Sequence, residues 1–293
     1  MTGAQWRGGG WPSAASTVVG VMGDPIAHSL SPLLHNTAFA LLGLDWVSVG
    51  FPVPTGGASE ALAAIVPLGI AGLSVTMPHK RAAAELADEL TPIAVRLQAV
   101  NCLVNRDGRL LGTNTDGQGF LDALARGAGF DPAGKRCVVI GAGGGARAVV
   151  VALGEAAASE VVVVARRPEP AVAAAELVPR GRVGSARDAP DADLVVNATP
   201  VGMPGNESAT ETAIVPGEAL GPGQVVVDLV YQPAETGWMA AATRKGAVVL
   251  GGLGMLVHQA AAQLELWTGL TPPVDAMWAA AEAARTERRN GKA

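Results

Sequence analysis

Cysteine is scarce in this chain of 293 residues, which contains only Cys102 and Cys137. Neither lies in a CxxC pair or in metal-ligand spacing, so the sequence offers no disulfide framework and no cysteine-based metal site. Both fall in apparent strands, where we expect buried, reduced thiols. No cluster of His, Cys and Asp residues indicates a metal, and we expect none.

Basic clusters, long apolar runs and a signal sequence are missing as well. The net charge is −5, and the Lys/Arg-rich tail 285–292 also contains Glu287, so there is no basic stripe of the kind that binds nucleic acid. Prolines and glycines interrupt the long uncharged stretch 61–79, which argues against a membrane span. Residues 1–16 lack the apolar core of a secretory signal. We expect a cytoplasmic protein with a frayed leader and no nucleic-acid or membrane partner.

What the chain does contain is enough apolar sequence for two domains. Apolar residues make up 49% and charged residues 16%, and the length suits two domains of roughly 100–200 residues each. Strand-like and helix-like segments alternate throughout, a pattern typical of α/β proteins with largely parallel sheets.

The first third predicts an α/β domain. Strands are expected at 17–22, 46–53 and 72–76, and a hairpin is expected about Asp107-Gly108, a strong turn signal. A helix should run from Pro32 to Leu42 with Ser31 as its cap. Pro78 should open a second helix that reaches Glu89.

From Asp116 the pattern predicts a doubly wound, Rossmann-type sheet. Strands are expected at 136–140, 160–165, 193–197, 224–229 and 247–250, and the last ~40 residues are helical. We therefore predict a substrate-binding and catalytic domain at 1–114, joined by the returning helices of 253–293. We predict a second domain at 115–252 between these two segments of the chain, with hinges near 114–115 and 251–252.

A glycine-rich turn follows the strand 136–140. Gly141 permits a tight turn, Gly143 lets the backbone approach a pyrophosphate, and Ala146 allows close packing of helix and strand. The helix that opens here offers free N–H groups to phosphates. At the end of the next strand, where NAD sites place a carboxylate, the chain has Arg166-Arg167. A guanidinium binds a 2′-phosphate, so NADP(H) is favoured over NAD, and we predict that 115–252 is an NADP-binding domain.

Small polar side chains gather where loops meet strands. They lie in the segments 29–32 and 74–80, at Asn101, in 114–116, and at the start of the late helix in 254–259. Hydroxyls and amides that converge with one lysine suit a compact polyhydroxylated acid. Lys80, Asp116 and a dinucleotide turn, in that order, indicate hydride transfer at a carbonyl or hydroxyl, with the lysine and the carboxylate handling the proton.

These segments, in this order, resemble the shikimate dehydrogenase (NADP-dependent) family over nearly the whole chain from Val18 to Trp267. The matching pieces are GDPIAHSLSP (23–32), SVTMPHK (74–80), AVN (99–101), NTDG (114–117), GAGGGARA (141–148), NATPVGM (197–203), DLVYQP (228–233) and GMLVHQ (254–259). The resemblance implies reversible NADPH-dependent reduction of 3-dehydroshikimate to shikimate in aromatic amino-acid (chorismate) biosynthesis. The sequence gives no oligomeric state, and a monomer or a homodimer is expected.

Carried over position by position, the resemblance assigns Lys80 and Asp116 as the catalytic pair. The substrate residues that it implies are Ser29 and Ser31 for the carboxylate, Tyr231 to close that pocket, and Thr76, Lys80, Asn101, Asp116 and Gln259 for the ring hydroxyls. The cofactor residues that it implies are Gly141, Ala142, Gly143, Gly144, Gly145 and Ala146 at the pyrophosphate, Arg166 with Arg167 at the 2′-phosphate, Asn197, Ala198 and Thr199 along the cleft, and Met203 and Gly252 near the nicotinamide.

The chain departs from the family pattern at three places. Ser74 and Cys102 stand where asparagine and threonine are usual, and Ala165 and Arg167 flank Arg166 where asparagine and threonine are usual. Two alternative functions stay open. One is a quinate/shikimate dehydrogenase that uses NAD, against which Ser29, Ser31 and the arginines argue. The other is a non-catalytic dinucleotide-binding regulator, which would be expected to lose Lys80 or Asp116.

Overall fold

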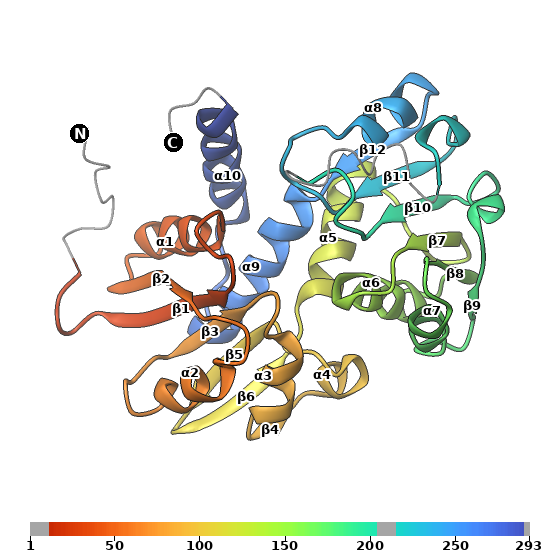
Figure 1. Ribbon diagram of the computed structural model, residues 1–293. Coiled ribbons are helices and arrows are strands. Elements are labelled where there is room, and N and C mark those ends of the chain that lie inside the picture. Colours follow the sequence, from red (N-terminus) through yellow and green to blue (C-terminus); the bar gives the residue numbers. More distant parts are fainter. Residues whose placement is uncertain (1–11, 204–214, 290–293) are drawn as a thin grey trace. The chain divides into compact units, whose positions relative to one another are not determined.

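The computed structural model describes residues 12–203 and 215–289 (Figure 1). Most of the expected leader therefore lies outside the described residues. The chain forms two compact units, one made of Met1–Thr115 with Gln259–Ala293 and the other of Asp116–His258. In the described part of the chain, no helix combines the length and the apolar character needed to cross a membrane.

The first unit is built on a six-stranded mixed sheet. Its strands are β1 (Thr17–Gly23), β2 (Trp46–Pro52), β3 (Gly72–Val75), β4 (Glu89–Leu90), β5 (Cys102–Arg106) and β6 (Arg109–Thr113). Their order across the sheet is β2-β1-β3-β5-β6-β4. β1 is parallel to both β2 and β3, whereas β5 runs antiparallel to β3 and β6. The end of β3 and the start of β5 therefore share one edge of the sheet.

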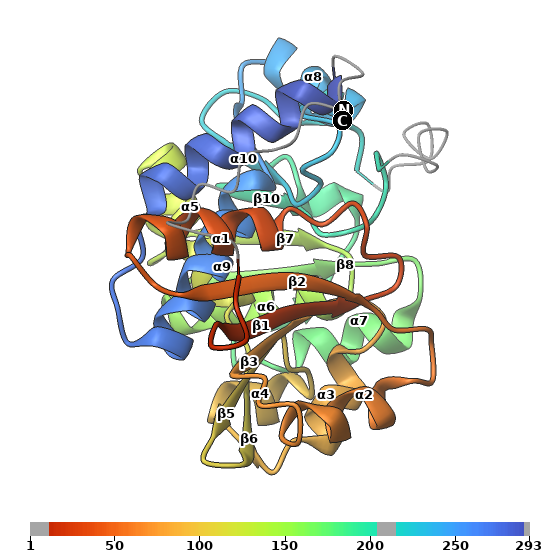
Figure 2. The same cartoon turned by 90° about the vertical axis from the view of Figure 1, so that its left-hand side faces the viewer.

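Helices cover both faces of this sheet. They are α1 (Ser31–Leu41), α2 (Ala58–Ile65), α3 (Lys80–Leu86), α4 (Pro92–Leu97), α9 (Leu253–Thr268) and α10 (Val274–Arg289). Figures 1 and 2 show α2, α3 and α4 on one face and α1 with α10 on the other. Alternate residues of the strands, such as Leu73 and Val75 of β3, pack with Leu62 and Ile65 of α2.

The hairpin predicted at Asp107-Gly108 is confirmed. β5 and β6 pair antiparallel out to Arg106 opposite Arg109, and the two residues between them have φ angles of 51° and 84°. Positive φ at both central positions is what a tight two-residue hairpin turn requires.

The second unit is a fully parallel sheet. Its strands are β7 (Arg136–Ile140), β8 (Glu160–Val164), β9 (Gly181–Val183), β10 (Leu194–Asn197), β11 (Val225–Asp228) and β12 (Val248–Gly251). The order is β12-β11-β10-β7-β8-β9. Counted from β7 this is the 3-2-1-4-5-6 arrangement, in which ligands bind at the carboxyl ends of the strands where the order reverses, here between β7 and β10.

Valine runs explain why these strands are central. Val138 and Val162 belong to the core on one face, and Val139 and Val163 to the core on the other, so the strands are buried on both sides. The covering helices are α5 (Asp116–Ala128), α6 (Gly144–Glu155), α7 (Pro168–Ala175) and α8 (Gly237–Arg244). The predicted α/β fold with a doubly wound second half is confirmed.

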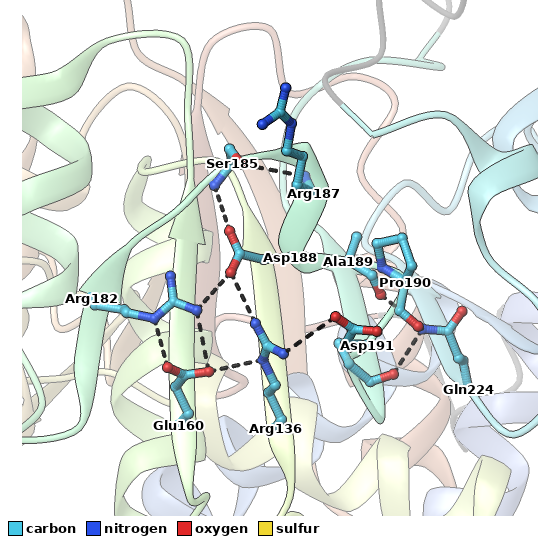
Figure 3. Close-up of polar contacts among 11 residues, drawn as sticks. Arg136, Glu160, Arg182, Ser185, Arg187, Asp188, Ala189, Pro190, Asp191 and Gln224 are labelled. Carbon is cyan, nitrogen blue, oxygen red and sulfur yellow. Dashed lines mark hydrogen bonds and ion pairs between the residues drawn. The ribbon is translucent and has the colours of Figure 1, made fainter.

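An ion-pair network joins the amino ends of β7 and β8 to β9 (Figure 3). The Arg182 guanidinium donates to Glu160 Oε1 at 2.6 Å and to Asp188 Oδ1 at 2.6 Å. Arg136 donates to the same Asp188 oxygen at 2.9 Å. Hydrogen bonds from Arg182 lower the pKa of both carboxyl groups. This network lies at the edge opposite the glycine turn, and we assign it to stability.

The chain passes from the first compact unit to the second between Thr115 and Asp116, and it returns to the first inside α9, between His258 and Gln259. The functional boundaries given from the sequence, 1–114 with 253–293 and 115–252, stay a prediction.

Candidate active site

One edge of the first sheet collects four of the polar segments expected to hold substrate. β1 and β3 are parallel neighbours, so the loops with Ser29 and Thr76 leave the sheet at the same edge. β5 begins opposite Ser74 of β3, which brings Asn101 to this edge as well. β6 ends at Thr113 opposite Cys102, so the segment that begins at Asn114 leaves the sheet at the same edge. The N–H of Val75 donates to the carbonyl of Asn101 at 2.8 Å. Sheet topology thus gathers side chains that are far apart in the sequence.

Lys80 is the first residue of α3 and is half-buried. Its carbonyl accepts from the N–H of Val100 at 2.8 Å, which holds its backbone beside Asn101. The helix predicted to begin at Pro78 and to reach Glu89 begins at Lys80 and ends at Leu86. Residues 76–79 form a turn instead, in which the N–H of His79 donates to the carbonyl of Thr76 at 3.0 Å. Lys80 is thereby placed at the helix start.

The two serines lie where the loop after β1 meets the start of α1. Ser31 is buried and Ser29 is half-buried. The expectation that the Ser31 side chain caps α1 is wrong, because Ser31 is already the first residue of the helix and Leu30 precedes it without a side-chain cap. Ser29 Oγ, two residues earlier, accepts from the Ser31 N–H at 3.2 Å. Serine hydroxyls often form local hydrogen bonds of this kind to nearby backbone groups, and such bonds compete with helix capping.

Asn101 and Thr115 are locked to each other. The Thr115 N–H donates to Asn101 Oδ1 at 2.8 Å, and Asn101 Nδ2 donates to Thr115 Oγ1 at 3.0 Å. Asp116 follows directly and begins α5, and its side chain is buried. Consecutive Cα atoms lie about 4 Å apart, so chain continuity holds the Asp116 backbone close to this edge.

Gln259 reaches the same edge from the other end of the chain. Its carbonyl accepts from Thr115 Oγ1 at 3.1 Å, across 144 positions of sequence. Its side chain is buried and its Oε1 accepts from Gln263 Nε2 at 2.9 Å. Helix α9 thus contributes a side-chain amide to the polar edge.

The glycine turn after β7 has the shape that a pyrophosphate requires. Gly141 has φ 115° and a Cβ there would come within 2.9 Å of the Ala198 carbonyl, so only glycine fits. A Cβ at Gly143 or Gly144 would meet no protein atom within 4 Å. These backbone positions are therefore open to a ligand at the start of α6.

The flanking positions complete the cofactor edge. Ala146 is fully buried in the core between α6 and the sheet, while Ala142 and Gly145 are partly exposed. Arg166 and Arg167 are exposed and directly follow β8, the parallel neighbour of β7. Two cations thus lie on the side of the turn where the adenosine half of a dinucleotide binds.

A buried hydrogen-bond network ties the loops after β10 and β11 together. Asn197 Nδ2 donates to Asp228 Oδ1 at 3.0 Å, and Asn197 Oδ1 accepts from Thr199 Oγ1 at 2.7 Å. Asp228 also accepts from the Val230 N–H at 3.0 Å and from Thr236 Oγ1 at 2.8 Å. Burial raises the pKa of Asp228 from 3.8 to about 6, although these hydrogen bonds oppose the increase. The network fixes where the two loops leave the sheet.

The remaining candidates lie on these loops or next to them. Ala198 and Met203 are partly buried after β10, and Tyr231 is partly buried after β11. At the end of β12, a Cβ on Gly252 would overlap the Leu229 carbonyl, so the close approach of these segments needs glycine. All of the predicted cofactor residues therefore lie at the carboxyl edge of one sheet or directly after it.

Sequence reasoning gave no role to three residues that support this site. Thr115 and Asp228 lie inside the quoted segments, but nothing local shows that their side chains bond to Asn101 and Asn197. Gln263 lies four residues after Gln259, a spacing that puts both on one helix face, and that signal could have found it. Within residues 12–203 and 215–289, no group of three His, Cys, Asp or Glu residues could hold a metal ion.

Comparison with protein families gives two matches. Residues 21–103 match the shikimate dehydrogenase substrate binding domain, and residues 252–282 match the shikimate 5′-dehydrogenase C-terminal domain. A shikimate dehydrogenase (NADP(+)) of Moorella thermoacetica is 45% identical over 275 residues, which cover 90% of this chain and 92% of that protein.

Solved structures agree in fold. The shikimate 5-dehydrogenase of Thermus thermophilus in complex with NADP(H) and shikimate is 39% identical, with a TM-score of 0.85, over 92% of this chain and 99% of that one. Quinate dehydrogenase of Corynebacterium glutamicum in complex with NAD is 31% identical, with a TM-score of 0.83, over 92% and 99%. Both alternatives for substrate and cofactor thus occur on this fold.

Proposed function

The chain belongs to the shikimate dehydrogenase family, and from that premise we propose that it catalyses the reversible NADPH-dependent reduction of 3-dehydroshikimate to shikimate. This step belongs to chorismate and aromatic amino-acid biosynthesis. The observation that carries the proposal is the sheet edge that brings Thr76, Lys80 and Asn101 together. That edge belongs to the unit whose sequence matches the family's substrate binding domain.

The proton chemistry falls to Lys80. Bound NADPH supplies the hydride that reduces the ring carbonyl. As negative charge builds on the carbonyl oxygen, the Lys80 ammonium stabilises it and donates a proton; in the oxidation of shikimate, the amine accepts that proton. Asp116, at the start of α5, orients Lys80 toward the reacting oxygen. The two residues act as the catalytic pair.

The substrate is held by hydroxyls and amides. Ser29 and Ser31 bind its carboxylate, and Tyr231 closes that end of the pocket. The ring hydroxyls bind to Thr76, Lys80, Asn101, Asp116 and Gln259. Buried hydroxyl groups on a substrate each need a donor and an acceptor, and this set of side chains supplies both.

The cofactor is held at the carboxyl edge of the second sheet. Gly141 to Ala146 receive the pyrophosphate, and Arg166 with Arg167 binds the 2′-phosphate. The cleft is lined by Asn197, Ala198 and Thr199, with Met203 and Gly252 toward the nicotinamide. The absence of a carboxylate after β8 favours NADP(H), because a carboxylate there would repel the phosphate.

Oxidation of quinate with NAD is the nearest alternative, since quinate dehydrogenase shares the fold. The serine pair and the two arginines favour shikimate and NADP. A non-catalytic regulator is disfavoured because Lys80 and Asp116 are both present. We further propose that the enzyme acts in the cytoplasm as a monomer or a homodimer.

Initial rates test the assignment. NADP⁺ and NAD⁺ reduction should be followed with shikimate and with quinate, for the natural chain and for Lys80→Ala. We expect shikimate with NADP⁺ to be the preferred pair, and we expect the variant to lose a factor of about 10² to 10⁴ in rate. The variant should keep its fold and its binding of NADP(H).

Lys245→Ala, which removes an exposed lysine after α8, is the matched control and should keep full activity. A preference for quinate with NAD⁺ would move the protein to the alternative activity. Tight NADP(H) binding without turnover of either substrate would favour the regulator.

A further inference from the structure

Gln263 is a fully buried glutamine on α9, one turn after Gln259. Its Nε2 donates to two oxygens, the backbone carbonyl of Asn101 at 3.0 Å and Gln259 Oε1 at 2.9 Å. Residues four apart share a helix face, so this pair points to the same side of α9. Gln263 thus contacts two residues to which we assign substrate binding, although it has no assigned contact with the substrate itself.

The chemistry of these contacts fixes the orientation of both amides. The oxygen and nitrogen of a side-chain amide have nearly the same shape, so their identity must come from their partners. A backbone carbonyl only accepts, so the Gln263 atom that faces Asn101 must be nitrogen. The Gln259 atom within reach of that nitrogen must then be oxygen. Gln259 is therefore left with its two N–H groups on the opposite branch of the amide.

Packing alone does not explain a glutamine at this position. Gln263 Oε1 is buried, and among the described residues no partner lies within hydrogen-bonding distance of it. An unpaired buried acceptor is destabilising, whereas methionine or leucine would fill a similar volume without that penalty. The benefit of the glutamine must come from its nitrogen, which is the atom that engages Gln259.

We propose that Gln263 is a positioning residue that holds the Gln259 amide with its N–H groups toward the substrate. Gln259 then acts as a hydrogen-bond donor, which selects a substrate that presents an oxygen acceptor, such as a ring hydroxyl, at that point. The backbone of Gln259 is fixed separately by Thr115, so Gln263 sets the orientation of the amide alone. This inference rests on the proposed function through the role given to Gln259.

The test is steady-state kinetics of Gln263→Met, which keeps the length of the side chain but has no donor. Loss of one oriented hydrogen bond should raise the KM for shikimate about tenfold, with the KM for NADP⁺ changed by less than about twofold. In a Gln259→Ala background the same substitution should change the KM for shikimate by less than about twofold, because a residue that acts only through its partner has no effect once the partner is gone.

Gln224→Met is the matched control. Gln224 is also buried, and its Nε2 donates to the carbonyls of Ala189 and Ala192 at 2.8 and 2.7 Å in the region shown in Figure 3. It lies just before β11, at the amino end of the second sheet. The substitution removes the same chemical group and should lower stability without raising the KM for shikimate. If it raises that KM as Gln263→Met does, the effect is general destabilisation and the inference is wrong.

The remaining outcomes of these experiments also decide whether Gln263 positions Gln259. An unchanged KM for shikimate in Gln263→Met, or an equal rise in the Gln259→Ala background, would overturn the positioning role. If Gln263→Met does not fold, Gln263→Leu takes its place, and failure of both to fold would assign Gln263 to folding alone. A natural chain that does not oxidise shikimate would contradict the proposed function instead. The positioning role would then be judged from the dissociation constant of shikimate in the same variants.

Discussion

Arg166 is the residue to which the proposed function assigns the choice between NADP and NAD. It is exposed directly after β8, where its guanidinium can reach a 2′-phosphate without first giving up a buried partner. Hydrogen bonds to charged groups contribute about 1.5–3 kcal/mol. We therefore expect Arg166→Ala to raise the KM for NADP⁺ by roughly 10- to 100-fold and to leave the KM for NAD⁺ nearly unchanged.

Steady-state rates with both cofactors check this expectation, with Arg167→Ala as the neighbouring comparison. If Arg166→Ala weakens NAD⁺ and NADP⁺ equally, then Arg166 does not read the phosphate. If only Arg167→Ala has the effect, the assignment moves by one residue.

The buried side chain of Asp228 makes the stability of the protein depend on pH. Because its pKa in the folded protein, about 6, lies above the ordinary value of 3.8, the folded state binds the proton more tightly than the unfolded state does. The contribution to stability is therefore full below about pH 4 and is lost as the pH rises toward 6, by at most about 3 kcal/mol.

Asp228→Asn removes this titration and keeps the shape of the side chain. Its stability relative to the natural chain should increase between pH 4 and pH 7, as measured by urea unfolding at several pH values. Asp131→Asn, in an exposed loop, is the control for the loss of a carboxylate. A stability difference between Asp228→Asn and the natural chain that does not vary with pH would contradict the expected coupling.

In the turn between β7 and α6, glycine has two different roles: Gly141 is needed for the conformation of the turn, and Gly143 is expected to leave room for the cofactor. Gly141→Ala forces a Cβ against the Ala198 carbonyl at a positive φ, so we expect lower stability. Gly143→Ala places a methyl group in open space, so the melting temperature should stay within about 2 °C while the KM for NADP⁺ rises at least tenfold.

Thermal unfolding without ligand, together with kinetics, distinguishes the two effects. Gly144→Ala, which also adds a Cβ in open space, shows how far along the turn the cofactor approaches. Unchanged cofactor kinetics in Gly143→Ala would mean that the pyrophosphate does not approach this position.

Elements with a strong local signal could be predicted from the sequence. The valine runs of β7 and β8 and the Asp107-Gly108 hairpin needed no tertiary information, because local conformation and continuous burial decide them. The starts of two helices were harder to predict. At Ser31 and Pro78, more than one local hydrogen-bonding arrangement was available, and the neighbouring loop residues determined which one formed.

At the scale of the whole molecule, the chain keeps two sheets in two compact units. The proposed function gives substrate binding to one and cofactor binding to the other. Binding slows hydrogen exchange where it prevents local opening. We expect NADP⁺ alone to protect amides in 141–147 and 165–167, and shikimate alone to protect those in 29–31, 76–80 and 99–101.

Hydrogen exchange followed by mass spectrometry measures both patterns on the full chain. The short helix Ala186–Asp188, whose Asp188 side chain bonds to Arg136 at the amino end of β7, serves as an internal control and should not change. Protection of 76–80 by NADP⁺ alone, as strong as that by shikimate, would contradict the separation of the two binding roles.

The sequence by itself determined the chemistry of the parts. Gly141 and Gly143 after a valine strand and Arg166 after the next strand are local patterns, and each predicts its role within a few residues. Only the tertiary structure decided which distant side chains support them. Gln263 bonds to Asn101 across 162 positions, and Asn197 bonds to Asp228 across 31. Periodicity shows which face of an element is buried, but the partner that covers that face is set by how all the elements pack together.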